Sequence, residues 1–170
     1  MIPLNENTWY AFSSMNRPSL LVSACLFGNT CRYNESCVAF KDSLWIEKQY
    51  TLIKVCPEQL GGLPTPRNPA EILTSRVVDA QGNDLTEAFV LGAERALAVA
   101  RASGCTTALL MDRSPSCGYH QIYDGTFSGT LIEGSGIFAQ LLKKNGFTIY
   151  TPTTVTALLS DMHVPGSEPL

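Results

Sequence analysis

At residues 20–25 the chain reads Leu20-Leu21-Val22-Ser23-Ala24-Cys25, an apolar run of strand length that ends at a cysteine. Two later runs repeat the pattern: 52–55 leads directly into Cys56, and 107–111 leads through a short turn into Cys117. Each run gives way to Gly, Pro or Ser, as buried strands do where they meet a loop. If the three strands are parallel neighbours, their cysteines arrive at one edge of one sheet, which is where open α/β folds bind ligands.

The rest of the chain alternates strands with helices. Besides the strand at 20–24, we expect strands at 50–55, 76–80, 106–111 and 147–150, and helices at 36–48, 84–102, 135–144 and 155–161. The alternation favours a parallel sheet with helices on both faces. The sequence therefore predicts a small single-domain, Rossmann-like α/β fold at 19–164, with an N-terminal extension at 1–18 and a tail at 165–170.

The composition is that of an ordinary globular protein. Of the 170 residues, 45% are hydrophobic and 16% are charged, which fits one domain with one core. A net charge of −3 gives no sign of direct nucleic-acid binding. No stretch approaches the roughly 20 consecutive apolar residues that span a bilayer, and the N-terminus lacks the pattern of a signal peptide. We therefore expect a cytoplasmic protein without a membrane partner.

The six cysteines are interpreted as thiols rather than disulfides, because a chain of this length folds without covalent staples. Cys25, Cys56 and Cys117 are candidate ligands of a metal or an iron–sulfur cluster, although free cysteine is also frequent as a small buried hydrophobe. Catalytic zinc sites usually include histidine, and this chain has only His120 and His163. Three thiolates without a nearby imidazole favour iron–sulfur over zinc.

The other three cysteines differ in their expected roles. Cys31 lies six residues after Cys25, close enough to reach the same site as a fourth ligand, a spare thiol or a packing residue. Cys37 is expected to begin a helix. Cys105 stands at the start of a strand, at the opposite edge of the sheet, and is expected to be structural.

Polar residues next to the candidate ligands suggest catalysis. Glu58, two residues after Cys56, could exchange protons near neutrality beside a buried cluster, or it could be a solvated loop glutamate. Ser114 and Ser116 precede Cys117, where their hydroxyls could bind a substrate or a cluster sulfide, or only stabilise a turn. Basic loop residues at 32, 67 and 113 could bind an anion, and the loop 124–129 could form a lid or wall beside the Cys117 turn.

Five segments, in this order, resemble the DUF523 family, which includes the thiouracil desulfurases. The similarity covers about 20–151, and its most specific part is the segment from Cys56 to Arg67. The segments are Ser23-Ala24-Cys25-Leu26-Phe27-Gly28, Cys31-Arg32-Tyr33, Val55-Cys56-Pro57-Glu58-Gln59-Leu60-Gly61-Gly62-Leu63-Pro64-Thr65-Pro66-Arg67, Arg113-Ser114-Pro115-Ser116-Cys117-Gly118 and Ile122-Tyr123-Asp124-Gly125-Thr126-Phe127-Ser128-Gly129.

This resemblance implies a [4Fe-4S] cluster held by Cys25, Cys56 and Cys117, with the fourth iron open to the sulfur of a substrate. It also implies that Glu58 donates and accepts protons and that a serine, here Ser114, assists. The implied reaction replaces the thiocarbonyl sulfur of a thiolated pyrimidine base, nucleoside or nucleotide with oxygen, without net electron transfer. For substrate binding we expect the residues Arg32, Tyr33, Arg67, Ser116 and Asp124.

Two departures from the family pattern bear on the substrate. The family usually has Tyr-Asp-Gly where this chain has Tyr33-Asn34-Glu35, and the segment that leads to Cys56 is short. Three other functions remain alternatives: a non-catalytic iron–sulfur protein for electron transfer or sulfide sensing, a zinc-dependent hydrolase, and a metal-free binding module.

Overall fold

A four-stranded parallel sheet forms the centre of the computed structural model, which describes residues 17–38 and 40–160. Its strand order is β2-β1-β5-β8, and all three neighbouring pairs are parallel. The predicted tail and His163 lie outside the described residues, as does all of the predicted N-terminal extension except its last two residues. The four strands are β1 (Ser19–Ser23), β2 (Thr51–Val55), β5 (Thr107–Leu109) and β8 (Thr148–Tyr150).

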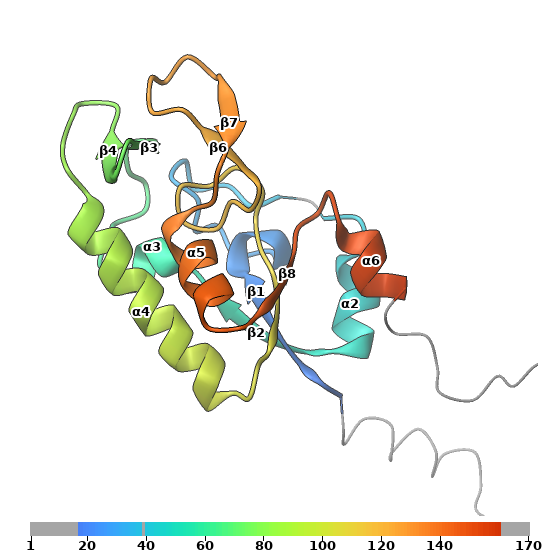
Figure 1. Ribbon diagram of the computed structural model, residues 1–170. Coiled ribbons are helices and arrows are strands. Elements are labelled where there is room, and N and C mark those ends of the chain that lie inside the picture. The colour runs from blue at the N-terminus through green and yellow to red at the C-terminus, as the bar shows by residue number, and fades with distance from the viewer. Residues whose placement is uncertain (1–16, 39, 161–170) are drawn as a thin grey trace, which may run out of the picture.

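Helices cover both faces of this sheet (Figure 1). On one face lie α4 (Thr86–Ala102) and α5 (Ile137–Lys144), and on the other lie α2 (Ser43–Gln49) and α6 (Val155–Ser160). In the part of the chain that the structure describes, no helix has the length and apolar character needed to cross a membrane. The predicted α/β fold with a helix-covered parallel sheet is confirmed.

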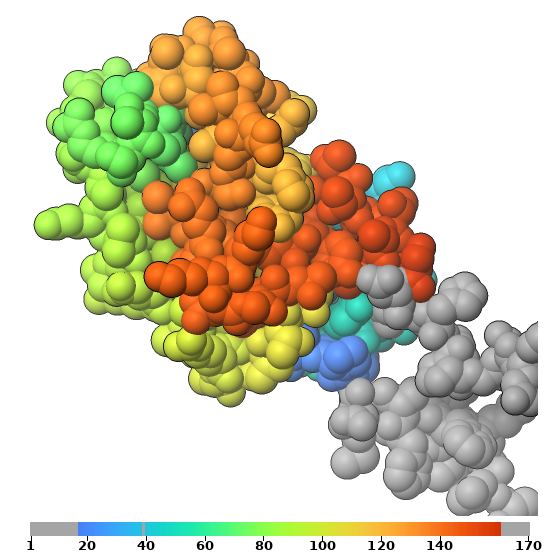
Figure 2. Space-filling view, viewed as in Figure 1, coloured from blue at the N-terminus to red at the C-terminus, as the bar shows by residue number. Residues whose placement is uncertain are grey.

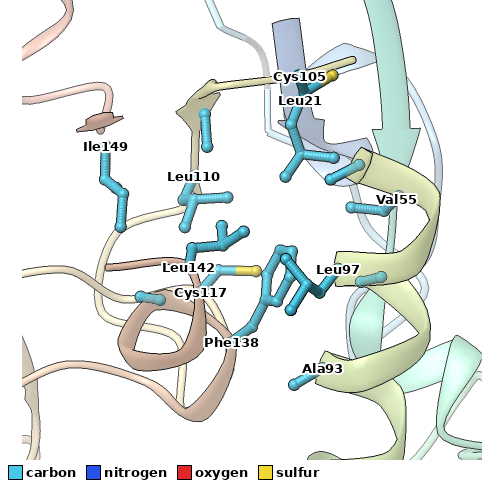
Figure 3. Packing of buried hydrophobic residues seen from close by; sticks show 14 residues of the cluster. Leu21, Val55, Ala93, Leu97, Cys105, Leu110, Cys117, Phe138, Leu142 and Ile149 are labelled. Carbon is cyan, nitrogen blue, oxygen red and sulfur yellow. The ribbon is translucent and has the colours of Figure 1, made fainter. Parts of the chain in front are cut away.

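The alternation of side chains along β1 explains why the sheet needs two helical layers. Leu21 packs toward α4 and α5, whereas Leu20 and Val22 pack into the cluster on the α2 and α6 side. Successive residues of a strand point to opposite faces, so an apolar run of this kind is buried only when both faces are covered. Figure 3 shows the first cluster, in which Phe138 and Leu142 of α5 meet the strand residues.

One predicted helix is wrong over its first half. The helix expected at 36–48 begins only at Ser43, and Cys37 is exposed outside any helix rather than at a helix start. The reason is a tertiary contact, because the backbone N–H of Val38 donates to the carbonyl oxygen of Cys25 at 2.9 Å. This bond holds the segment as irregular chain beside the end of β1.

Two antiparallel hairpins stand apart from the main sheet. The first joins β3 (Ala70–Leu73) to β4 (Arg76–Asp79), so the strand predicted at 76–80 exists but belongs to this hairpin. The second joins β6 (Gln121–Tyr123) to β7 (Leu131–Glu133), and neither of these strands was predicted. β3 contacts β6, and Figure 2 shows the green and orange hairpins next to each other at one end of the molecule.

Two short helices follow the strands that carry the candidate ligands. A 3-10 helix (η1, Ala24–Phe27) continues β1, and α3 (Pro57–Leu60) continues β2. After α3, the segment 61–69 contains neither helix nor strand, as predicted from its prolines and glycines, and its Thr65–Pro66 peptide bond is cis. The carboxyl ends of the central strands therefore open directly into short, shaped segments.

Candidate functional site

A cavity of about 800 Å³ lies where β1, β2 and β5 end. The two hairpins also contribute to its wall, through residues of β3, β6 and the loop that follows β6. Four cysteines line this cavity: Cys25, Cys31, Cys56 and Cys117. The sheet thus brings the three predicted ligands to one cavity, together with the fourth cysteine whose role the sequence left open.

Parallel register explains how residues so far apart in the sequence meet. Ser23 pairs with Val55 across β1 and β2, so the residues that follow them, at the start of η1 and α3, lie side by side. Val22 pairs with Leu109 of β5, which leads to the turn before Cys117. Cysteines placed just after neighbouring parallel strands therefore reach the same edge.

Cys31 lies between two of the predicted ligands. A hydrogen bond with Cys25 is the main cause that raises the pKa of the Cys31 thiol to about 11. A hydrogen bond with Cys31 and then burial raise the pKa of Cys56 far above its usual value. The Cys56 Sγ atom is also 3.8 Å from the carbonyl oxygen of Cys31, which can accept a hydrogen bond from it. Cys25, Cys31 and Cys56 thus form one contact group.

Cys117 occupies a drier position at the same cavity. It is 5% exposed and belongs to the apolar cluster of α4 and α5, where Figure 3 shows it beside Leu142 and Phe138. Burial raises the pKa of its thiol to about 12, and a hydrogen bond with Ser23 opposes this effect in part. Thiols of this kind are protonated at neutral pH, and they are deprotonated when a strongly positive partner such as a metal centre binds the thiolate.

The donor set fits an iron–sulfur cluster better than a single zinc ion. Several thiols face the cavity, and no imidazole from the described part of the chain does, because His120 is exposed beside Tyr119 and does not line it. Within residues 17–38 and 40–160, no group of three or more His, Cys, Asp or Glu side chains is arranged to hold a single metal ion. Thiolate donors in a sheltered cavity are what iron–sulfur clusters use.

Glu58 reaches the cavity from α3, where it stands in the first turn of the helix. Its Oε2 atom accepts two hydrogen bonds from Arg67, at 2.8 Å from Nε and 2.6 Å from Nη2. Both side chains are largely buried, with 17% of Glu58 and 8% of Arg67 exposed. A buried ion pair with two hydrogen bonds fixes the carboxylate in place.

Arg67 has no donor left for a substrate. Its remaining N–H groups donate to the carbonyl oxygens of Cys31 and Pro64 and to the hydroxyl of Thr65, at 3.0 to 3.1 Å. All five N–H groups of the guanidinium are therefore used within the protein. Arg67 lines the cavity and its side chain links Glu58 to the segment that carries Cys31, while its contact with substrate stays a prediction.

The two serines before Cys117 separate clearly. Ser114 lines the cavity, and its Oγ atom accepts hydrogen bonds from the backbone N–H groups of Ser116 and Cys117, both at 3.1 Å. Its own hydroxyl proton can therefore be donated toward the cavity. Ser116 is fully buried and does not line the cavity, and its hydroxyl lies beside the Cys117 thiol, whose pKa a hydrogen bond with Ser116 lowers in small part. The geometry opposes the expected substrate contact of Ser116.

The other predicted substrate contacts divide in the same way. Arg32 and Tyr33 line the cavity, as does Arg113, which was considered only as a possible anion contact. Arg32 donates to the hydroxyl of Ser36 at 3.4 Å and lies 5.9 Å from the centre of the Tyr33 ring. Asp124 does not line the cavity, because its carboxylate accepts hydrogen bonds from the backbone and hydroxyl of Thr126 in its own turn.

Sequence reasoning missed Glu71 of β3, whereas Phe127 lies in the loop 124–129 that was expected to form a lid or wall, and both residues line the cavity. The available signal for Glu71 was a lone acid in the apolar run Ala70-Glu71-Ile72-Leu73, since a carboxylate is rarely buried without a specific partner. Phe127 gave a weaker signal, as a large apolar residue in a turn of small and polar residues. Cys105, by contrast, is buried in the apolar core, as expected for a structural cysteine.

Comparison with known proteins identifies the family. A model of the 2-thiouracil desulfurase family matches residues 20–153. The “Uncharacterized protein YbbK” of Bacillus subtilis (strain 168) is 40% identical over 150 residues, which cover 82% of this chain and 99% of the relative. The solved structure of the “[4Fe-4S]-dependent thiouracil desulfidase TudS (DUF523Vcz)” is 38% identical with a TM-score of 0.73, covering 85% of this chain and 99% of that one. On these findings, and as its motifs predicted, the chain belongs to the 2-thiouracil desulfurase family, known also as DUF523.

Proposed function

We propose that this protein is a [4Fe-4S]-dependent desulfurase that replaces the thiocarbonyl sulfur of a thiolated pyrimidine with oxygen. Family membership and the solved relative support the activity. The observation within the structure that carries the proposal is the meeting of four thiols, an ion-paired Glu58 and the Ser114 hydroxyl in one cavity. The combination supplies ligands for a cluster and proton-transfer groups next to it.

The cluster ligands in this proposal are Cys25, Cys56 and Cys117, one from each strand end. A bound [4Fe-4S] cluster with three protein ligands supplies an open iron, a Lewis acid that attracts the substrate's sulfur. Cys31 is the direct competitor for a place in the ligand set, because it contacts both Cys25 and Cys56. We assign Cys31 to the cavity wall, where its carbonyl oxygen accepts a hydrogen bond from Arg67.

The chain's own groups handle the water and the protons. Glu58, held by Arg67, takes a proton from the water that attacks the thiocarbonyl carbon, and Ser114 donates a hydrogen bond to the substrate. A C–O bond forms and the C–S bond breaks. The products are the oxo base and hydrosulfide, and no electrons are transferred. General acid–base help of this kind typically contributes about 100- to 10,000-fold in rate.

The cavity is large enough for more than a free base. Its volume of about 800 Å³ lies in the usual range for small-molecule sites. Arg113 forms no hydrogen bond or ion pair through its side chain with the described residues, so its charge is available to a ligand. A thiolated base, nucleoside or nucleotide therefore remains the proposed substrate, with Arg32, Tyr33 and Arg113 near its outer part.

The test is turnover by protein reconstituted anaerobically with iron and sulfide, on a panel of 2-thio and 4-thio pyrimidines and their nucleosides and nucleotides. We expect conversion of at least one substrate with release of sulfide, and a protein with about four iron and four acid-labile sulfide atoms per chain. Zinc at about one atom per chain, or a loaded protein that converts nothing in the panel, contradicts the proposal.

Single variants then test the residues. Glu58→Gln should keep the iron and lose turnover by about 100-fold or more. Alanine at Cys25, Cys56 or Cys117 should abolish cluster binding, while Cys31→Ala should leave iron content largely intact. Loss of iron from Cys31→Ala with retention in Cys117→Ala would exchange these two cysteines in the ligand set.

A further inference from the structure

The loop that joins β6 to β7 places an aromatic residue at the cavity. Phe127 lines the cavity and is 37% exposed. None of the hydrophobic clusters among the described residues includes it. A phenylalanine that does not serve the core but borders a cavity is available to a ligand.

A buried carboxylate holds this loop. The Oε2 atom of Glu71, on β3, accepts the backbone N–H groups of Gly125 and Phe127, each at 3.0 Å. Glu71 is 9% exposed, and no salt bridge among the described residues reaches it. Burial of a carboxylate is unfavourable unless it is hydrogen-bonded, so these two charge-assisted bonds account for its place and tie the loop to the first hairpin.

The backbone at Phe127 is in an unusual conformation. Its φ is +57°, in the left-handed region that bulky residues rarely adopt. The turn lies hard against β3, because a Cβ added at Gly125 would be 2.7 Å from the carbonyl oxygen of Ile72. A strained residue persists only where its surroundings hold it, and such residues gather at functional sites. The loop, Gly125 and Glu71 together fix the backbone position from which the Phe127 side chain extends.

We propose that Phe127 is the aromatic residue against which the pyrimidine ring of the substrate stacks, and that Glu71 is the positioning residue that keeps it there. The inference rests on the proposed function and adds a ring-recognition site to it. Aromatic side chains bind nucleobases by stacking in a manner that tolerates different bases. Phe127 thus recognises the flat ring, while the thiols and Glu58 act on its sulfur-bearing carbon.

The test compares Phe127→Leu with Phe127→Tyr in cluster-loaded protein. Phe127→Leu should raise KM for 2-thiouracil about 5- to 100-fold, from the strength of base stacking, while kcat changes little. Phe127→Tyr, which keeps the ring, should stay within about twofold of the wild type on the same scale. Ile132→Ala is the matched control, since Ile132 is 44% exposed on the same hairpin and does not line the cavity.

Glu71→Gln tests the positioning role. It should raise KM in the wild-type background but have little further effect in the Phe127→Leu background, because Glu71 acts through the ring. Equal effects in both backgrounds would show a role independent of Phe127 and overturn this part. Thermal melts of each variant confirm that the domain is folded.

Binding of uracil, measured by calorimetry without turnover, separates this inference from the proposed function. If loaded wild-type protein binds uracil and Phe127→Leu weakens that binding, ring recognition stands even if desulfuration fails. A wild-type KM and uracil affinity retained in Phe127→Leu overturns the inference while leaving the desulfurase in place. Absence of binding of uracil and of every thiolated pyrimidine in the panel to the wild type overturns both.

Discussion

Replacement of Gly92 by alanine tests how α3 is held in the site. α3 carries Glu58 and follows Cys56, and it crosses α4 where Gly61 and Gly92 face each other. A Cβ added at Gly92 would lie 1.9 Å from the carbonyl oxygen of Pro57 and 2.9 Å from the backbone nitrogen of Gly61. The missing side chain of Gly92 is therefore what lets the two helices touch.

The magnitude follows from that distance. Ordinary Cβ contacts begin at 3.4 Å, so α3 must move by about 1.5 Å to accept the new methyl group. Overpacking of backbone costs about 3 kcal/mol at the upper end of its usual range, against which alanine gains about 1 kcal/mol in helix propensity. The net loss is about 2 kcal/mol, or about 4–8 °C in Tm for a domain of this size. A shift of about 1 Å at a catalytic group also costs on the order of 100-fold in rate.

The assay measures urea unfolding of the cluster-loaded protein and turnover with the same preparation. Val90→Ala is the control, because Val90 is 41% exposed on the same helix and should change the free energy of unfolding by no more than about 0.5 kcal/mol. An alanine at Gly92 that stabilises the protein by about 1 kcal/mol, with turnover unchanged, would refute the close approach of α3 to α4.

Three further results are expected. Arg67→Lys should lower kcat more than it raises KM, since lysine keeps the charge but cannot replace five directed N–H groups; a pure KM effect in steady-state kinetics would instead indicate substrate contact. Ser116→Ala should leave turnover nearly unchanged and lower Tm by about 2–4 °C, because its buried hydroxyl lies outside the cavity and its hydrogen bond with Cys117 is worth about 1 kcal/mol, whereas a large rise in KM would restore Ser116 to the substrate site. Hydrogen bonds, first from the side chain of Asn83, lower the pKa of Asp79 to about 2. The stabilising effect of the Asp79 carboxylate is therefore complete above the unfolded pKa of 3.8 and is lost as pH falls toward 2. The Tm difference between wild type and Asp79→Asn should shrink over that range, and a difference that stays constant with pH would contradict this assignment.

The main sheet and the cysteine edge were predictable because their signals are local. Each central strand is an apolar run of sufficient length, and parallel register alone then brings the residues after Ser23 and Val55 together. Strands β3, β6 and β7 were not predicted, because they carry too little periodicity in three or four residues, whereas the equally short β5 lies inside the longer apolar run 107–111. One of them also placed the strand at 76–80 outside the main sheet.

Within the site, residue types were easier to predict than partners. The motif placed Glu58 and Arg67 at the functional edge, but only the folded segment 61–69 brings the guanidinium back onto the carboxylate. In the turn before Cys117, the hydroxyl of Ser114 faces the cavity, whereas the hydroxyl of Ser116 is buried. Which of the two serines faces the cavity depends on the geometry of the turn, and the spacing of the serines in the sequence does not specify that geometry.

The separate hairpins have a consequence for how this scaffold can change. Among the described residues, β3–β4 and β6–β7 form their own two-stranded sheets outside the main ladder, and an isolated bridge between Ile122 of β6 and Arg113 ties the second hairpin to the turn before Cys117. Insertions or altered side chains in the two hairpins can therefore change the part of the cavity wall that they form without changing the strand pairing of the main sheet. Changes in these two hairpins, whether they arise in evolution or by laboratory selection, can thus alter substrate preference while the cysteines of the proposed cluster site are kept.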